Sequence, residues 1–153
     1  MKMVKLSQIL VMVVIGSLIS FYSFASSELI SLDELEWEQR LVLINVDSQP
    51  LLNDFMWSLD NDILADYRLS VFALINDEAY QLMPTALMKR VDSLDSDLQR
   101  RVPTPQQVVV VGLDGAVKAT YRIDDLTIDK VMALINTMPM RQVEINKSSN
   151  VEF

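Results

Sequence analysis

The sequence predicts a single α/β domain in which helices cover both faces of a four-stranded mixed sheet. Two continuous apolar runs, at residues 40–47 and 69–75, are bounded by charged or turn-forming residues, which is typical of strands buried on both faces. A helical pattern lies between them, so we expect the two strands to be parallel neighbours. Nearer the C-terminus, Asp114-Gly115 separates two further strand-like runs and predicts an antiparallel hairpin.

The first half of the chain alternates helix and strand. Ser31 is a favourable N-cap and Glu34 follows at the capping-box position, so a short helix is predicted over residues 31–37. After the first strand, Pro50 interrupts the apolar run. A second helix is predicted over residues 52–67, because apolar side chains recur there at helical spacing: Leu52, Phe55, Met56, Leu59 and Ile63.

The segment after the second strand is predicted to be a third helix. Asn76-Asp77 ends the strand, and Pro84 can occupy the first turn of a helix. Apolar residues then form one stripe at helical spacing: Leu87, Val91, Leu94 and Leu98. Pro103 and Pro105 end this segment, because proline disfavours a helical residue before it.

The C-terminal half contains the predicted hairpin and a last helix. Residues 107–112 read as a buried strand, and residues 117–122 alternate apolar and polar side chains, as an edge strand would. Thr127 is expected to cap a helix that ends at Pro139. Its buried face would be formed by Ile128, Val131, Met132, Ile135 and Met138. Residues 147–153 are expected to form a flexible tail.

Composition and charge exclude several classes of function. The 153 residues include neither cysteine nor histidine, which rules out thiol nucleophiles, disulfides, imidazole bases and soft-metal sites. Acidic residues outnumber basic ones by 21 to 13, a formal net charge of -8, which would repel the phosphates of a nucleic acid. We therefore expect no nucleic-acid partner, and the charge favours basic partners.

The first 25 residues have the pattern of a secretory signal peptide. Lys2 and Lys5 precede an apolar stretch, and Ser23-Phe24-Ala25 places small residues at the positions that a signal peptidase reads. The alternative is an uncleaved membrane anchor, because the stretch is close to the length that spans a bilayer. In either case residues 26–146 would form the folded domain outside the cytoplasm, and we expect a bacterial periplasmic or secreted protein.

Specific segments carry a resemblance to a known family. The order of elements, with prolines before the third strand and an Asp-Gly hairpin after it, is similar to the thioredoxin fold. Residues 135–142 (Ile-Asn-Thr-Met-Pro-Met-Arg-Gln), 112–115 and 35–43 resemble the bacterial DUF4174 family, whose members are exported thioredoxin-like proteins. The resemblance covers residues 32–144. The family is related to a peroxiredoxin-like module of animal extracellular proteins, which implies interaction more readily than catalysis.

The resemblance also locates a candidate site. In thioredoxins a Cys-x-x-Cys pair follows the first central strand, at a helix N-terminus that lowers the pKa of the thiol. The matching residues 47–51 contain no thiol, so no catalytic residue is carried over. What remains is a rim for binding an anion or a peptide, unless Ser48 is simply a helix cap. The rim consists of Ser48, Gln49, Pro103, Thr104 and Pro105, and the thioredoxin resemblance allows a cis peptide bond at Pro103 or Pro105.

We expect neither a metal nor a cofactor. Two groups of oxygen ligands lack the glycine and the distal glutamate of a calcium loop, so they are interpreted as solvated helix faces. These groups are Asp60, Asn61, Asp62 and Asp66, and Asp92, Asp95 and Asp97.

The leading hypothesis is an exported thioredoxin-like binding module without redox chemistry, whose partner is an envelope or secreted protein. It would have no membrane partner unless the leader stays uncleaved. The alternative is a periplasmic enzyme of unknown class that uses carboxylates as acid and base on the same rim.

Overall fold

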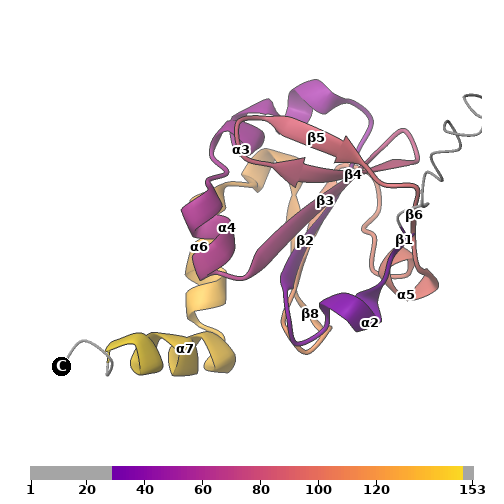
Figure 1. Ribbon diagram of the computed structural model, residues 1–153. Helices are drawn as coiled ribbons and strands as arrows, with labels where there is room; N and C mark the ends of the chain where they lie inside the picture. The colour runs from indigo at the N-terminus through magenta and orange to yellow at the C-terminus, as the bar shows by residue number, and fades with distance from the viewer. Residues whose placement is uncertain (1–28, 150–153) are drawn as a thin grey trace, which may run out of the picture.

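A six-stranded mixed sheet forms the centre of the computed structural model, which describes residues 29–149 (Figure 1). The strand order is β5-β4-β3-β2-β7-β8. The strands are β2 (Arg40–Val46), β3 (Leu69–Ile75), β4 (Glu78–Met83), β5 (Leu87–Arg90), β7 (Gln107–Val111) and β8 (Val117–Arg122). A separate two-stranded sheet pairs β1 (Leu29–Ile30) in parallel with β6 (Ser93–Leu94).

The predicted strands and their pairing are confirmed. β2 and β3 are parallel neighbours, with Arg40 opposite Leu69 and Val46 opposite Ile75. β7 and β8 form the antiparallel hairpin, and β7 also pairs with β2 in antiparallel orientation. The C-terminal end of β2 therefore lies beside the N-terminal end of β7.

The prediction of four strands is wrong, because residues 78–83 form β4 and the third predicted helix does not form. Residues 84–98 instead contribute β5, β6 and a short helix, α5 (Ser96–Gln99). Asn76 and Asp77, both at positive φ, make a two-residue turn that reverses β3 into β4. Thr85 and Ala86, also at positive φ, lie in the next turn. The apolar stripe that suggested a helix is distributed over separate elements, and its first member, Leu87, is exposed on the edge strand β5.

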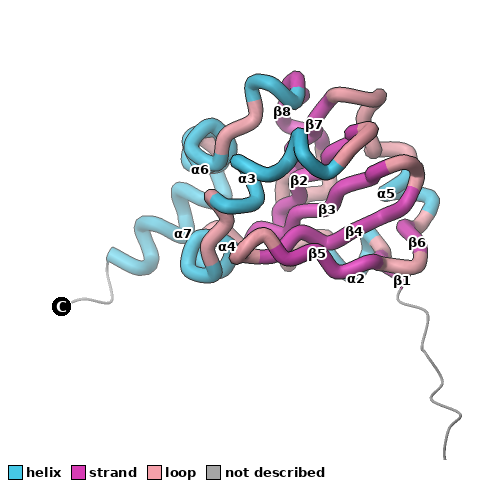
Figure 2. Tube along the Cα trace, turned by 90° about the horizontal axis from the view of Figure 1, so that it is seen from above, coloured by secondary structure: helices cyan, strands magenta, loops and turns pink. Residues whose placement is uncertain are grey.

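Helices cover both faces of the sheet (Figures 1 and 2). One face carries η1 (Gln49–Leu52), α3 (Asn53–Trp57), α4 (Asn61–Asp66), η2 (Ile123–Asp125) and α6 (Ile128–Asn136). The other face carries α2 (Leu32–Leu35), β6 and α5. The predicted helix over residues 52–67 is thus divided into a 3-10 turn and two short helices, since Asp60 adopts extended backbone and caps α4.

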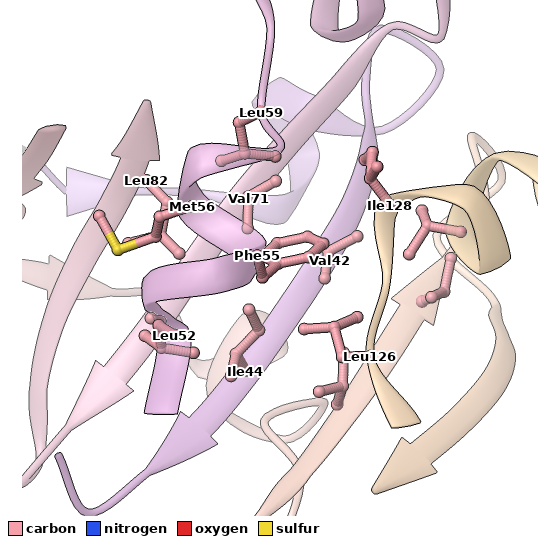
Figure 3. Packing of buried hydrophobic residues seen from close by; sticks show 14 of the residues in the cluster. Val42, Ile44, Leu52, Phe55, Met56, Leu59, Val71, Leu82, Leu126 and Ile128 are labelled. Atoms are coloured by element: carbon pink, nitrogen blue, oxygen red, sulfur yellow. The ribbon is translucent and has the colours of Figure 1, made fainter. Parts of the chain in front are cut away.

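Two apolar clusters hold these layers together, because successive strand residues point to opposite faces. On the first face, Phe55 of α3 points towards Val42 and Ile44 of β2 (Figure 3). On the second face, Leu41 and Leu43 pack with other buried side chains, namely Leu32, Phe72, Val91, Leu94, Leu98, Val109 and Val111.

Two helix ends differ from the predicted ones. The α2 cap, Ser31, makes no capping hydrogen bond, and the N–H of Leu32 instead donates to Asp95 at 2.7 Å. Thr127 does cap α6 as predicted, but the chain does not leave helical structure at Pro139. Pro139 starts α7 (Pro139–Ser149), since its missing N–H costs nothing in a first turn. This helix includes residues 147–149 of the expected tail.

The predicted signal peptide, residues 1–25, lies outside the described residues, as do residues 150–153. Among residues 29–149, no helix has both the length and the apolar character needed to cross a membrane.

Candidate functional site

A cavity of about 540 Å³ opens at the C-terminal end of the parallel strands β2 and β3. Along one face of β2 the side chains run Leu41, Leu43 and Asn45, so an amide replaces the next aliphatic group. Asn45 lies opposite Leu74 of β3, which in turn lies opposite Ala79 of β4. These three residues line the floor of the cavity. We call the whole cavity the acidic pocket, because Asp77, Glu78 and Asp92 also line it.

The walls of the acidic pocket come from segments that follow β4 in the sequence. One wall is residues 90–94, between β5 and β6. Another is formed by Gln99 of α5 and Val102. The tight turn between β3 and β4 places Asp77 and Glu78 at the mouth. In open α/β sheets, this position beyond the carboxyl ends of parallel strands is where ligands bind.

The pocket carries an excess of negative charge. Its lining contains three carboxylates, from Asp77, Glu78 and Asp92, against one guanidinium, from Arg90. Glu78 holds Arg90 in an exposed ion pair at 2.9 Å and also accepts a hydrogen bond from the hydroxyl of Tyr80 at 2.7 Å. That hydrogen bond raises the pKa of Tyr80. With its one cation already paired, the cavity favours a cationic ligand.

The neutral groups of the pocket also present acceptors to a ligand. The amide nitrogen of Asn45 donates to the Pro103 carbonyl at 2.9 Å, and that of Gln99 donates to the Leu94 carbonyl at 2.6 Å. Each amide uses one of its two N–H donors in these bonds, and its oxygen is an acceptor. Carboxylates and amide oxygens can both accept hydrogen bonds from ammonium or guanidinium groups.

The structure brings the two segments of the predicted rim together. The backbone N–H of Gln106 donates to the Asn45 carbonyl at 2.8 Å, and its side chain donates to Asp47 at 2.7 Å. The segment that contains Ser48 and Gln49 therefore lies beside the segment that contains Pro103, Thr104 and Pro105. Ser48 precedes η1 without making a side-chain cap.

None of the five predicted rim residues lines the acidic pocket, although their neighbours Asn45 and Val102 do. Ser48 is half-buried, Gln49, Thr104 and Pro105 are exposed, and Pro103 is buried. Residues 29–149 contain no cis peptide bond, so Pro103 and Pro105 are both trans. The sequence signal for the pocket was Asn45 itself, one amide within a continuous apolar strand.

Two of the carboxylates considered for metal binding cap helices. Within residues 29–149, no three acidic side chains are grouped in a way that could hold a metal ion. Asp60 and Asp95 serve as N-caps of α4 and α5. Burial alone would raise the pKa of Asp95, but hydrogen bonds from the N–H groups of Leu98 and Leu32 outweigh it and lower that pKa.

The fold and the cavity define an α/β domain with an open, acidic pocket at the end of its parallel strand pair. Within that class, the chain belongs to the DUF4174 family, described as a domain of unknown function, whose profile matches residues 31–144. The match runs from the residue before α2 to Glu144 in α7. No curated protein and no solved structure matches the chain.

Proposed function

We propose that this protein is a non-catalytic binding module that holds a basic segment of a partner protein in the acidic pocket. The observation that carries the proposal is the cavity of about 540 Å³ lined by three carboxylates and one paired arginine. Cavities of this size accommodate small molecules or a few side chains. Asn45 and Gln99 also line the cavity, and their amide oxygens are acceptors that a lysine or arginine side chain can use.

We further propose that the domain is an exported, thioredoxin-like scaffold that acts outside the cytoplasm on an envelope or secreted partner. The leader-like residues 1–25 support export. The parallel β2–β3 pair, the β7–β8 hairpin and the adjacent segments at residues 47–49 and 103–106 support the thioredoxin relationship. The predicted rim would then form the outer border of the contact with the partner. The lack of cysteine excludes dithiol exchange.

The test is a titration of the ¹⁵N-labelled protein with the peptide acetyl-Arg-Gly-Arg-amide, followed by NMR. Saturable shifts are expected at the side-chain amide signals of Asn45 and Gln99. Asp92→Asn should weaken binding about three- to tenfold, because it removes one of the carboxylates. Arg90→Gln should strengthen binding, because it removes the competing cation.

The matched control is Asp129→Asn, which makes the same charge change on α6, a helix of the other face. Asp129→Asn should leave the affinity nearly unchanged. If it weakens binding as much as Asp92→Asn does, the peptide is attracted only by net charge and the proposal fails. Absence of shifts at Asn45 and Gln99 would also exclude it.

A second candidate is an enzyme that uses pocket carboxylates as acid and base. It is favoured by one observation, that Asp77, Glu78 and Asp92 line the same cavity. Turnover of a bound substrate that is lost in Asp92→Asn while binding persists would support this candidate over the binding module.

A further inference from the structure

A second cavity, of about 260 Å³, lies at the opposite end of β2 from the acidic pocket. It forms where the N-terminal end of β2 and the C-terminal end of β7 meet the junction of α6 and α7. Its apolar lining comes from Trp37, Leu113, Met138, Pro139 and Met140. We call it the Trp37 pocket.

Trp37 lines this pocket from a backbone position that two hydrogen bonds fix. Trp37 adopts a φ of 66°, a conformation that a bulky residue rarely takes, and its side chain is 56% exposed. Its N–H donates to the Leu113 carbonyl at 2.6 Å, and its carbonyl accepts from the Arg68 guanidinium. Strain that is fixed in this way concentrates at functional sites. The backbone from which the ring projects is thus fixed, and the ring forms one wall of the pocket.

Cationic side chains line the inner and outer parts of the Trp37 pocket. Arg40 is wholly buried, and its Nε has no hydrogen-bond partner within residues 29–149, although both of its terminal nitrogens are bonded. Lys118 lies at the other side, paired with Asp114 at 2.7 Å. Gly112 leaves room for this pair, because a Cβ there would lie 2.5 Å from Lys118 Cε. Glu144 compensates the charge of Arg40 and Asp114 that of Lys118, so the donors that the lining offers a ligand are the Nε–H of Arg40, unpartnered among residues 29–149, and the ammonium of Lys118.

The apolar lining and the two basic side chains of the Trp37 pocket together indicate the kind of ligand that it binds. An aromatic wall and methionine side chains favour an apolar body, whereas the Nε–H of Arg40, unpartnered in the described part of the chain, and the ammonium of Lys118 are donors that favour a carboxylate at its end. The volume is below that of most drug-sized sites, so the apolar body must be one ring or a short chain. The two cavities lie at opposite ends of β2 and share no lining residue among those described, so this site can be tested separately from the acidic pocket.

We propose that the Trp37 pocket binds a small apolar carboxylate, with its ring or short chain between Trp37 and Met140 and its carboxylate towards Lys118 and Arg40. The carboxylate displaces Asp114 as the partner of Lys118. The same chemistry occurs in a free organic acid and in the C-terminal residue of a peptide.

The test measures ligand binding through the fluorescence of Trp37. The chain contains two tryptophans, and Trp57 is 70% exposed on α3, so Trp57→Phe leaves Trp37 as the only one. Titration of this variant with 4-phenylbutyrate should give a saturable change in Trp37 fluorescence. The neutral analogue 4-phenylbutanol should bind about tenfold more weakly. Binding of N-acetyl-phenylalanine equal to that of 4-phenylbutyrate would identify a peptide C-terminus as the source, whereas weaker binding would identify a free acid.

Two lysine variants separate this site from general charge effects. Lys118→Gln should weaken binding of 4-phenylbutyrate about five- to tenfold, because it removes the cation at the mouth. Lys130→Gln, the matched control on α6, changes an exposed lysine paired with Asp125 at 3.5 Å and should have no effect. The proposal is overturned if no saturable change occurs, if the alcohol binds as well as the acid, or if the two variants behave alike.

Discussion

Arg40 and Glu144 meet at 3.1 Å across the end of β2, although 104 positions separate them in the sequence. Arg40 is completely buried, and one of its terminal nitrogens donates to both carboxylate oxygens of Glu144. Its other terminal nitrogen donates to the Tyr67 carbonyl at 2.8 Å. The pair attaches α7 to the sheet, because it gives a buried cation its counter-charge.

Arg141 makes a second attachment from the same helix. Its guanidinium lies 4.3 Å above the Tyr67 ring and pairs with Asp66 at 2.5 Å. Burial alone would lower the pKa of Arg141, but the Asp66 carboxylate outweighs it and raises that pKa. Two buried arginines thus connect α7 to the body of the domain.

Glu144→Gln should destabilise the fold by about 2–4 kcal/mol, because it removes the counter-charge of a buried arginine while keeping the shape of the side chain. Urea unfolding followed by circular dichroism measures the change.

The control for this prediction is Glu38→Gln. Glu38 is 77% exposed and lies 4.0 Å from Arg68, so its loss should cost less than about 1 kcal/mol. Equal effects of the two variants would show that Arg40 does not depend on Glu144.

Asp95→Ala should cost about 1–2 kcal/mol at pH 7, because Asp95 both caps α5 and binds the N–H of Leu32. Since the folded protein lowers the pKa of Asp95, its carboxylate adds stability above the unfolded pKa of about 3.9. That contribution is lost as the pH falls through the folded pKa.

The pH dependence can be measured by comparing urea midpoints of the parent and Asp95→Asn between neutral and acid pH. The difference should shrink below about pH 4. A difference that is constant with pH would mean that the charge of Asp95 contributes nothing.

Asn45→Leu should close part of the acidic pocket. The new side chain continues the row of Leu41 and Leu43, while the hydrogen bond to the Pro103 carbonyl is lost. The gain in apolar burial and the lost hydrogen bond are similar in size, so stability should change by less than about 1.5 kcal/mol. Binding of acetyl-Arg-Gly-Arg-amide, followed by NMR, should weaken about tenfold. Unchanged affinity would mean that the pocket is not the binding site.

The glycines at the two ends of the β7–β8 connection should respond differently to alanine. Gly115 has a φ of 66°, so Gly115→Ala should cost about 1 kcal/mol or more. At Gly112 the new Cβ meets only the flexible ends of Lys118 and Asp114. Gly112→Ala should therefore cost less in thermal unfolding.

Gly112→Ala should also raise the pKa of Asp114, because the hydrogen bond from Lys118 is the main cause of its lowering. NMR titration of the Asp114 carboxyl measures that pKa. An unchanged pKa would show that the pair accommodates the methyl group.

The four predicted strands and their pairing could be read from sequence because continuous valine-rich and leucine-rich runs have few alternatives to a buried strand. Residues 84–98 could not be read in this way. Apolar residues three or four positions apart can lie on one face of a helix, but they can also come from separate short elements that each bury one side chain in the core. A signal was present in Asn76-Asp77, since asparagine and aspartate tolerate the positive φ of a hairpin turn.

For the candidate site, too, the sequence predicted one part and not the other. The thioredoxin resemblance placed Ser48 and Gln49 on one rim with residues 103–105, and the antiparallel pairing of β2 with β7, which the sequence did not predict, brings these segments together. The sequence did not indicate the acidic pocket, whose charged residues come from the turn after β3 and from the segment between β5 and β6.

By itself, the sequence determined the α/β class, the DUF4174 membership and the exclusion of thiol and imidazole chemistry, because each depends on residue type and local order. Only the tertiary structure decided that a further helix, α7, begins at Pro139, that the sheet has six strands and that an acidic and a largely apolar cavity lie at the two ends of β2. These features depend on contacts between residues far apart in the chain, such as Arg40 with Glu144, and local patterns carry no information about such contacts.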